Sequence, residues 1–99
     1  MKYKLILSPF AELDLEQANS YYNIQREGLE DEFIEELENS LKRIKNNPKQ
    51  YPKVLKEIRK ANVRRFPYGI FYVFRDNVIN ILAIFHFSRN PKIWKSRYK

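Results

Sequence analysis

Residues 70–87, IFYVFRDNVINILAIFHF, decide the fold that this sequence predicts. Two apolar runs, residues 70–75 and 78–87, flank the dipeptide Asp76-Asn77. Aromatic and β-branched residues favour strands, and a two-residue Asp/Asn turn between such runs is typical of a β-hairpin. Because both faces of the second run are apolar, we expect it to be an interior strand of the sheet.

Strict alternation along the second strand assigns its side chains to two faces. Alternation places Ile79, Ile81, Ala83 and Phe85 on one face, and Val78, Leu82 and Ile84 on the other. His86 is the only histidine, and it shares the face of Ile84. If helices cover the Phe85 face, His86 lies on the open face, where an imidazole can act as a general acid or base near neutral pH. The alternative is a histidine that caps the core with one hydrogen bond.

Upstream of the hairpin, residues 54–66 mix apolar with basic side chains. This segment predicts one long bent strand or two short strands broken near Lys60, and residues 67–69 predict the turn that follows. Arg59, Arg64 and Arg65 lie on this segment, and arginine can bind phosphates or carboxylates through two parallel hydrogen bonds. Charge on an edge strand also discourages aggregation, which is the alternative explanation for the cluster.

The first half of the chain predicts a short strand at residues 3–7 and two helices. Ser8-Pro9 is a strong helix start, because serine can cap the helix and the proline nitrogen needs no partner there. The buried stripe expected for the first helix is Ala11, Leu15, Ala18 and Tyr22, widened by Phe10, Leu13, Tyr21 and Ile24. Gly28 ends this helix. The second helix has apolar residues at Ile34, Leu37, Leu41 and Ile44 and ends before Pro48.

The element order is therefore β-α-α-β-β-β in one domain over residues 1–99. We expect an α+β fold in which a helical hairpin packs on one face of a small antiparallel sheet. With 99 residues, of which 43% are hydrophobic, the chain has enough apolar content for one modest core.

Several classes of function are excluded by composition. The chain has no cysteine, which rules out disulfides, cysteine zinc sites and thiol catalysis, and one histidine is too few for a His-rich metal site. No phosphate-binding loop or dinucleotide fingerprint is present. We therefore expect neither a metal nor a cofactor. The N-terminal apolar run is too short for a signal peptide or a membrane span, which predicts a cytoplasmic protein.

The net charge of +7 is unevenly divided along the chain. Residues 1–50 contain seven Lys/Arg against ten Asp/Glu, a net charge of −3. Residues 51–99 contain twelve Lys/Arg against only Glu57 and Asp76, a net charge of +10. This segregation indicates an anionic partner, either a nucleic acid or an acidic protein segment.

The C-terminal residues 88–99, SRNPKIWKSRYK, follow the second hairpin strand directly. We expect a turn or short helix that folds back, so that Ile93 and Trp94 cover the sheet. In that arrangement Lys92, Lys95, Arg97 and Lys99 remain available to bind an anion.

The sequence resembles the RelE/ParE superfamily of type II toxin–antitoxin toxins, and within it the ParE-like, plasmid-stabilisation branch. The specific parts are VRRFPYGIFYVF at residues 63–74 and ILAIFHFSRNPKIW at residues 81–94, which contain Arg65, His86, Arg89 and Trp94. The helical segments match only in pattern. The resemblance covers nearly the whole chain and implies the RelE/ParE fold.

By this resemblance the chain is a growth-arresting toxin that a labile antitoxin neutralises, often through a flexible acidic segment. ParE-like members poison DNA gyrase and are not known to cleave anything, and the motifs favour this branch. The alternative is a RelE-like endonuclease that cleaves mRNA in the ribosome, with Arg65, His86 and Arg89 as catalytic residues. A non-toxic nucleic-acid-binding module is a third possibility. The residues expected to bind the target or the antitoxin are Arg59, Arg64, Lys92, Lys95, Arg97 and Tyr98.

Overall fold

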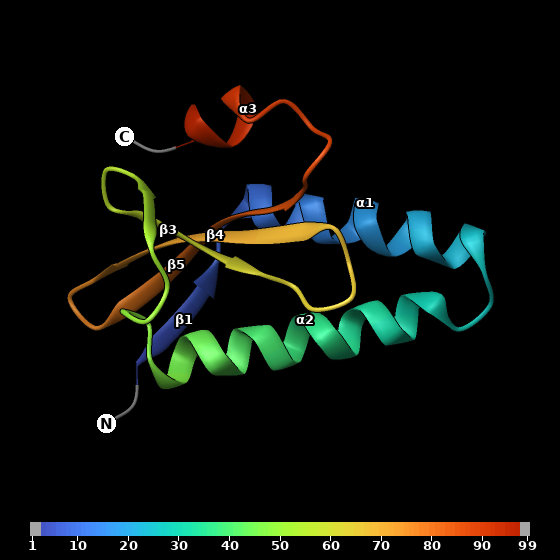
Figure 1. Cartoon of the computed structure of the whole chain (residues 1–99), viewed down its shortest axis with the longest axis horizontal. Coiled ribbons are helices and arrows are strands. Elements are labelled where there is room, and N and C mark those ends of the chain that lie inside the picture. Colours follow the sequence, from blue (N-terminus) through green and yellow to red (C-terminus); the bar gives the residue numbers. More distant parts are fainter. Residues whose placement is uncertain (1–2, 98–99) are drawn as a thin grey trace.

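The computed structural model describes residues 3–97 and contains one sheet with two long helices on one of its faces (Figure 1). The elements are β1 (Lys4–Leu7), α1 (Pro9–Gln25), α2 (Leu29–Asn46), β2 (Lys53–Leu55), β3 (Ile58–Asn62), β4 (Tyr68–Arg75), β5 (Val78–His86) and α3 (Lys92–Lys95). The strand order is β1-β5-β4-β3-β2, so β5 is an interior strand. The predicted α+β fold with a helical hairpin is confirmed.

The direction of β1 differs from the prediction. β1 runs parallel to β5, with Leu5 opposite Ile79 and Leu7 opposite Ile81, whereas the other three strand pairs are antiparallel. The expectation of a purely antiparallel sheet is therefore wrong. Parallel neighbours need a long connection, and both helices and three strands lie between β1 and β5 in the chain.

The β4–β5 hairpin forms where the sequence predicts it. Asp76 and Asn77 both have positive φ, 54° and 63°, as a two-residue type I′ turn requires. Upstream, the break between β2 and β3 falls at Lys56, whose φ is 50°, and not near Lys60. The next turn spans residues 63–67 and contains Arg64 and Arg65, so these two arginines are in a turn and not on a strand.

A β-bulge in β5 reverses the predicted alternation of its side chains. Phe71 lies opposite Ala83 and Tyr72 lies opposite Ile81, so Leu82 is an extra residue without a partner on β4. Beyond this point every side chain changes face. Ile79, Ile81 and Ile84 belong to the core under the helices, whereas Leu82, Ala83 and Phe85 belong to the cluster on the opposite face. The predicted faces of four residues are therefore wrong: Ala83, Ile84, Phe85 and His86.

The core between the helices and the sheet is rich in aromatic rings. Tyr22 of α1 and Phe33 of α2 pack against Phe66 and Tyr68, with ring centroids between 5.1 and 6.0 Å apart. Such edge-on and tilted contacts add to the free energy that area burial contributes. These rings join the helical hairpin to β4.

Only a narrow face of α1 is covered. Its buried residues are Ala11, Asp14, Ala18 and Tyr22. Phe10, Leu13, Tyr21 and Ile24, which we expected to widen the buried stripe, are exposed. This part of the prediction is wrong: the contacts of α1 with α2, β5 and β1 leave these four side chains at least half exposed.

Two buried tyrosines predict how stability depends on alkaline pH. Burial raises the pKa of Tyr68 and of Tyr72 to about 12, from 10.0 for an exposed side chain. The unfolded chain loses these protons near pH 10, so the stability they contribute is complete below about pH 10 and is lost as pH rises towards 12. We expect the urea midpoint to fall across this range. Tyr72→Phe should make the fall smaller, and a midpoint constant from pH 9 to 12 would contradict the prediction.

Candidate functional site

The C-terminal segment packs against the face of the sheet that the long helices leave open. Trp94 of α3 is 6% exposed and stacks on Phe71 of β4, with ring centroids 4.2 Å apart and an interplanar angle of 22°. Leu82, Ala83 and Phe85 complete this cluster. The expectation that Trp94 covers the sheet is confirmed, but Ile93 is exposed.

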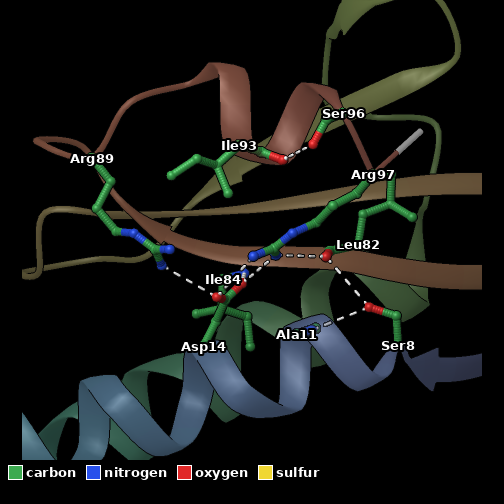
Figure 2. A network of polar contacts seen from close by, with 9 residues as sticks. All are labelled: Ser8, Ala11, Asp14, Leu82, Ile84, Arg89, Ile93, Ser96 and Arg97. Atoms are coloured by element: carbon green, nitrogen blue, oxygen red, sulfur yellow. Dashed lines mark hydrogen bonds and ion pairs between the residues drawn. The ribbon is translucent and has the colours of Figure 1, made fainter.

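A buried carboxylate on α1 holds both arginines of this segment (Figure 2). Asp14 has a side chain only 3% exposed. Arg97 donates from Nη1 to Asp14 Oδ2 at 2.7 Å and from Nη2 to Oδ1 at 3.3 Å, and Arg89 Nη1 lies 3.2 Å from Oδ1. Arg97 is itself 9% exposed in its side chain. This network therefore connects α1 to the chain beyond β5.

The same network caps a free edge of β5. β1 ends at Leu7, so the later part of β5 has no strand partner on that side. The Ile84 N–H donates to Asp14 Oδ2 at 3.1 Å, and the carbonyl of the bulged Leu82 accepts from Arg97 Nη1 at 3.1 Å. Buried backbone groups need such partners, and a covered edge cannot pair with another chain.

Ser8 adds the N-terminus of α1 to this arrangement. Its Oγ accepts from the Ala11 N–H at 3.1 Å, which confirms the predicted helix cap, and donates to the Leu82 carbonyl at 3.4 Å. Figure 2 shows the strands between α1 and α3, with Asp14 and Arg97 meeting at the strand edge. The position of α3 is thus set by α1 as well as by the sheet.

His86 lies on the helix side of the sheet and outside the Asp14 network. Its ring packs edge-on against Tyr68, with centroids 5.1 Å apart, and its Nδ1 accepts from the Ser88 N–H at 3.0 Å. A neutral ring with Nδ1 as acceptor carries its proton on Nε2. These contacts match the alternative of a histidine that caps the core.

Arg65 is held by a different helix. Its guanidinium lies 2.8 Å from Glu32 and 3.7 Å from Glu36, both on α2. Hydrogen bonds from Arg65 and then Arg26 lower the pKa of Glu32 below its usual value. The structure therefore gives the three candidate catalytic residues separate partners: α2 for Arg65, Tyr68 and Ser88 for His86, and Asp14 for Arg89.

Two more predicted binding residues lie near the β2–β3 edge. Arg59 Nη1 donates to the backbone carbonyls of Lys49 and Tyr51, at 3.2 and 2.6 Å, and so holds the loop between α2 and β2. Arg64 is exposed and lines a hollow of about 490 Å³.

This cationic hollow, defined by Arg43, Lys60 and Arg64, has no acidic residue among the described residues that line it. Tyr51 and Val54 contribute aromatic and aliphatic surface. Arg43 donates to Ser40 Oγ at 3.0 Å, and within residues 3–97 none of the three cations has an ion-pair partner. Their charge is therefore available to an anionic partner.

Lys92 and Lys95 of α3 are exposed and make no ion pair with any described residue. Tyr98 and Lys99 lie outside the described residues. Arg97, which we expected to be free, is bound to Asp14. The exposed cationic surface of the C-terminal segment, as far as the structure describes it, thus consists of the two lysines.

Asp14 is the residue of this site that the sequence reasoning missed. An acid in the opening turns of a helix is also favoured by the helix dipole, so its presence there does not by itself indicate a buried role. Its position, three residues after Ala11 and four before Ala18, is on the buried side of α1. A carboxylate at such a spacing indicates a buried ion pair, because an isolated buried charge is costly.

The described part of the chain, residues 3–97, contains no group of histidine and acidic residues arranged to hold a metal ion. None of its helices is long and apolar enough to cross a membrane.

The fold matches a solved structure described as "Chromosomal ParDE TA system from P. aeruginosa". The TM-score is 0.72 at 19% sequence identity, over 85% of this chain and 95% of that chain. At this identity the similarity defines the fold, which is that of a small α+β protein from a toxin–antitoxin system. No curated protein matches the sequence.

The sequence model of the family described as "ParE toxin of type II toxin-antitoxin system, parDE" matches residues 5–91. The chain belongs to this family and is a ParE-type toxin of a type II toxin–antitoxin system. A ParDE system implies an antitoxin as partner. The matched residues include Asp14 and Arg89 and end before α3.

Proposed function

We propose that this toxin arrests growth by poisoning DNA gyrase and that its cognate antitoxin neutralises it. The proposal rests on which cationic side chains have partners within the chain and which do not. The two candidate catalytic arginines are bound to carboxylates of the chain, whereas the cations of the hollow and of α3 are available to a partner. We propose that the chain acts in the cytoplasm, where gyrase is found.

The separate partners of the candidate catalytic residues support gyrase over mRNA as the target. Cleavage through a ribose 2′-OH needs a proton acceptor, a proton donor and a cation that stabilises the phosphorane, all within one small site. Arg65 is bound to Glu32 and Arg89 to Asp14, while the Nδ1 of His86 is bound to Ser88. Each of the two arginines already has a carboxylate as its counter-charge, which competes with a phosphate for the guanidinium.

Binding of a large partner needs no such assembly, because it depends on the shape and charge of a surface. We propose that the exposed lysines of α3 contact the target and that the cationic hollow binds an acidic segment of the antitoxin. The acidic outer surface of the helical hairpin is less suited to either partner.

A supercoiling assay tests the proposed target directly. With purified gyrase and relaxed plasmid, we expect the toxin, made by cell-free synthesis, to stop supercoiling and to leave linear DNA after protein is removed. Heat-denatured toxin is the control. Unchanged supercoiling at an excess of toxin, together with cleavage of mRNA on ribosomes, would favour the endonuclease alternative instead.

Association with the antitoxin should depend on salt and on the hollow. We expect the association rate to fall as ionic strength rises, because screening weakens the attraction between the basic toxin and an acidic segment. Lys60→Gln with Arg64→Gln should slow association several-fold at low salt, measured by stopped-flow fluorescence. Lys42→Gln with Lys45→Gln, which removes two charges from exposed positions on the acidic helical hairpin, is the matched control. Equal effects of both changes would contradict this assignment.

A further inference from the structure

An exposed apolar stripe runs along the whole of α1. Phe10, Leu13, Tyr21 and Ile24 are 55%, 55%, 52% and 81% exposed. Gln17, also exposed, lies at the centre of the stripe. At 100° per residue, these five positions fall within an arc of about 80° on the helix. Arg97 Cζ lies 4.9 Å from the Phe10 ring centroid, so this end of the stripe touches the Asp14 network, yet 55% of Phe10 remains exposed.

The spacing of the stripe is the same from either end. Steps of three, four, four and three residues lead from Phe10 through Gln17 to Ile24. When two such helices pack antiparallel around a two-fold axis at Gln17, Phe10 lies opposite Ile24 of the second copy, and Leu13 lies opposite Tyr21. Each large side chain then meets another, and each glutamine meets its own equivalent.

We propose that the toxin forms a two-fold symmetric dimer through α1. A two-fold interface needs a surface that is complementary to itself, which the stripe is. Antiparallel packing along a stripe of this period is also an ordinary geometry for two straight helices. None of the stripe residues lines the cationic hollow.

The area of the stripe indicates a weak interface. A large apolar side chain has roughly 150–250 Å² of surface, so the four exposed fractions amount to roughly 350–600 Å² per copy. Two copies would bury about 700–1,200 Å², which is below the size of most stable specific interfaces. We therefore expect a dimer that dissociates on dilution.

The net charge of +7 opposes association of two copies, so added salt should strengthen the dimer. This dependence is opposite to that expected for the antitoxin. The two interactions can therefore be distinguished in the same buffer series.

A cysteine on the proposed axis provides the decisive test, because the chain has no natural cysteine. Gln17→Cys should form a disulfide-linked dimer under mild oxidation, since Cα atoms must lie within about 7 Å for a disulfide. Asn23→Cys is the matched control, because it is exposed on the same helix but turned away from the stripe. Efficient cross-linking of the control, or none at position 17, would overturn the proposal.

Sedimentation of the unmodified toxin measures the same equilibrium without oxidation. We expect a shift from one chain to two as the concentration rises. Leu13→Lys alone and Tyr21→Glu alone should each abolish this shift. A mixture of these two variants should associate again, because positions 13 and 21 face each other across the axis. A wild-type chain that stays monomeric at about 500 µM in high salt would overturn the dimer. If an antitoxin helix then bound to the stripe of that monomer, the stripe would be an antitoxin-binding surface. Neither of these two results tests the proposal that gyrase is the target of the toxin.

Discussion

Replacing Asp14 by alanine is expected to lower the free energy of unfolding by roughly 3–5 kcal/mol. The carboxylate is buried, and its removal leaves Arg97 inside the protein without a counter-charge and the Ile84 N–H without an acceptor. Small domains have only about 5–15 kcal/mol in total, so this variant should be partly unfolded at 37 °C. Urea denaturation followed by circular dichroism gives the measurement.

Glu12→Ala is the matched control, because Glu12 is an exposed carboxylate near Asp14 on the same helix. Its effect should be within about 0.5 kcal/mol, as for most surface substitutions. Equal losses for the two variants would mean that the destabilisation comes from helix propensity or dipole effects and not from the buried ion pairs.

A double replacement shows whether the Asp14 network serves mainly to stabilise the fold or to place α3. A buried ion pair can often be replaced by apolar residues of similar size without loss, so Asp14→Leu with Arg97→Met should recover part of the stability that Asp14→Leu alone loses. Recovery of stability without recovery of toxicity would indicate that the Asp14 network serves mainly to place α3. No recovery would mean that the backbone contacts to Ile84 and Leu82 dominate.

The features that the sequence predicted well depend on neighbouring residues. Asp76-Asn77 turns the β4–β5 hairpin because asparagine and aspartate tolerate positive φ, and Ser8 caps α1 because its hydroxyl reaches the Ala11 N–H. The apolar period of α2 likewise marks its buried face. Each of these requires only a few consecutive residues.

The features that the sequence did not predict depend on distant partners. The bulge at Leu82 leaves the apolar character of β5 unchanged, so a run of apolar letters cannot reveal it, although it moves His86 to the other face. Asp14 resembles any acid near a helix start until Arg97, 83 residues later, is brought beside it. The direction of β1 relative to β5 also depends on distant parts of the chain, because the helical hairpin and three strands lie between them.

The binding residues show a related limit. Charge segregation places the excess of positive charge in the second half of the chain, but it does not show which cations are bound internally. It also gives no sign of Arg43, a cation of the hollow that lies in the first half. Arg59 holds a loop and Arg97 holds α3 in place, while Arg64 remains exposed. The amphipathic period of α1 also failed to predict which of its side chains are buried. The period alone does not distinguish an apolar face that packs against the core from one that stays exposed.

Neutralising the exposed lysines of α3, by Lys92→Gln with Lys95→Gln, is expected to weaken growth arrest about tenfold. Exposed charge pairs are worth up to about 1 kcal/mol each, and 1.4 kcal/mol corresponds to a factor of ten in affinity. Truncation of the chain at Lys95 is a poorer test, because it also removes Arg97 and so disturbs the Asp14 network. The matched control is Lys42→Gln with Lys45→Gln, which removes the same charge from exposed positions on α2.

His86→Gln separates the two possible activities in the same growth assay. If the toxin poisons gyrase, this change should matter little, because His86 packs on Tyr68 away from α3 and glutamine can keep one hydrogen bond. If the toxin were an endonuclease with His86 as acid or base, cleavage should fall by roughly 10²-fold or more. If gyrase is the target, cells that express the toxin should show DNA damage signalling and filamentation. At equal levels of soluble toxin, Lys92→Gln with Lys95→Gln should reduce both responses. Three results together would contradict gyrase as the target: translation that stops first, cut mRNA in the ribosome, and a His86→Gln variant that no longer arrests growth.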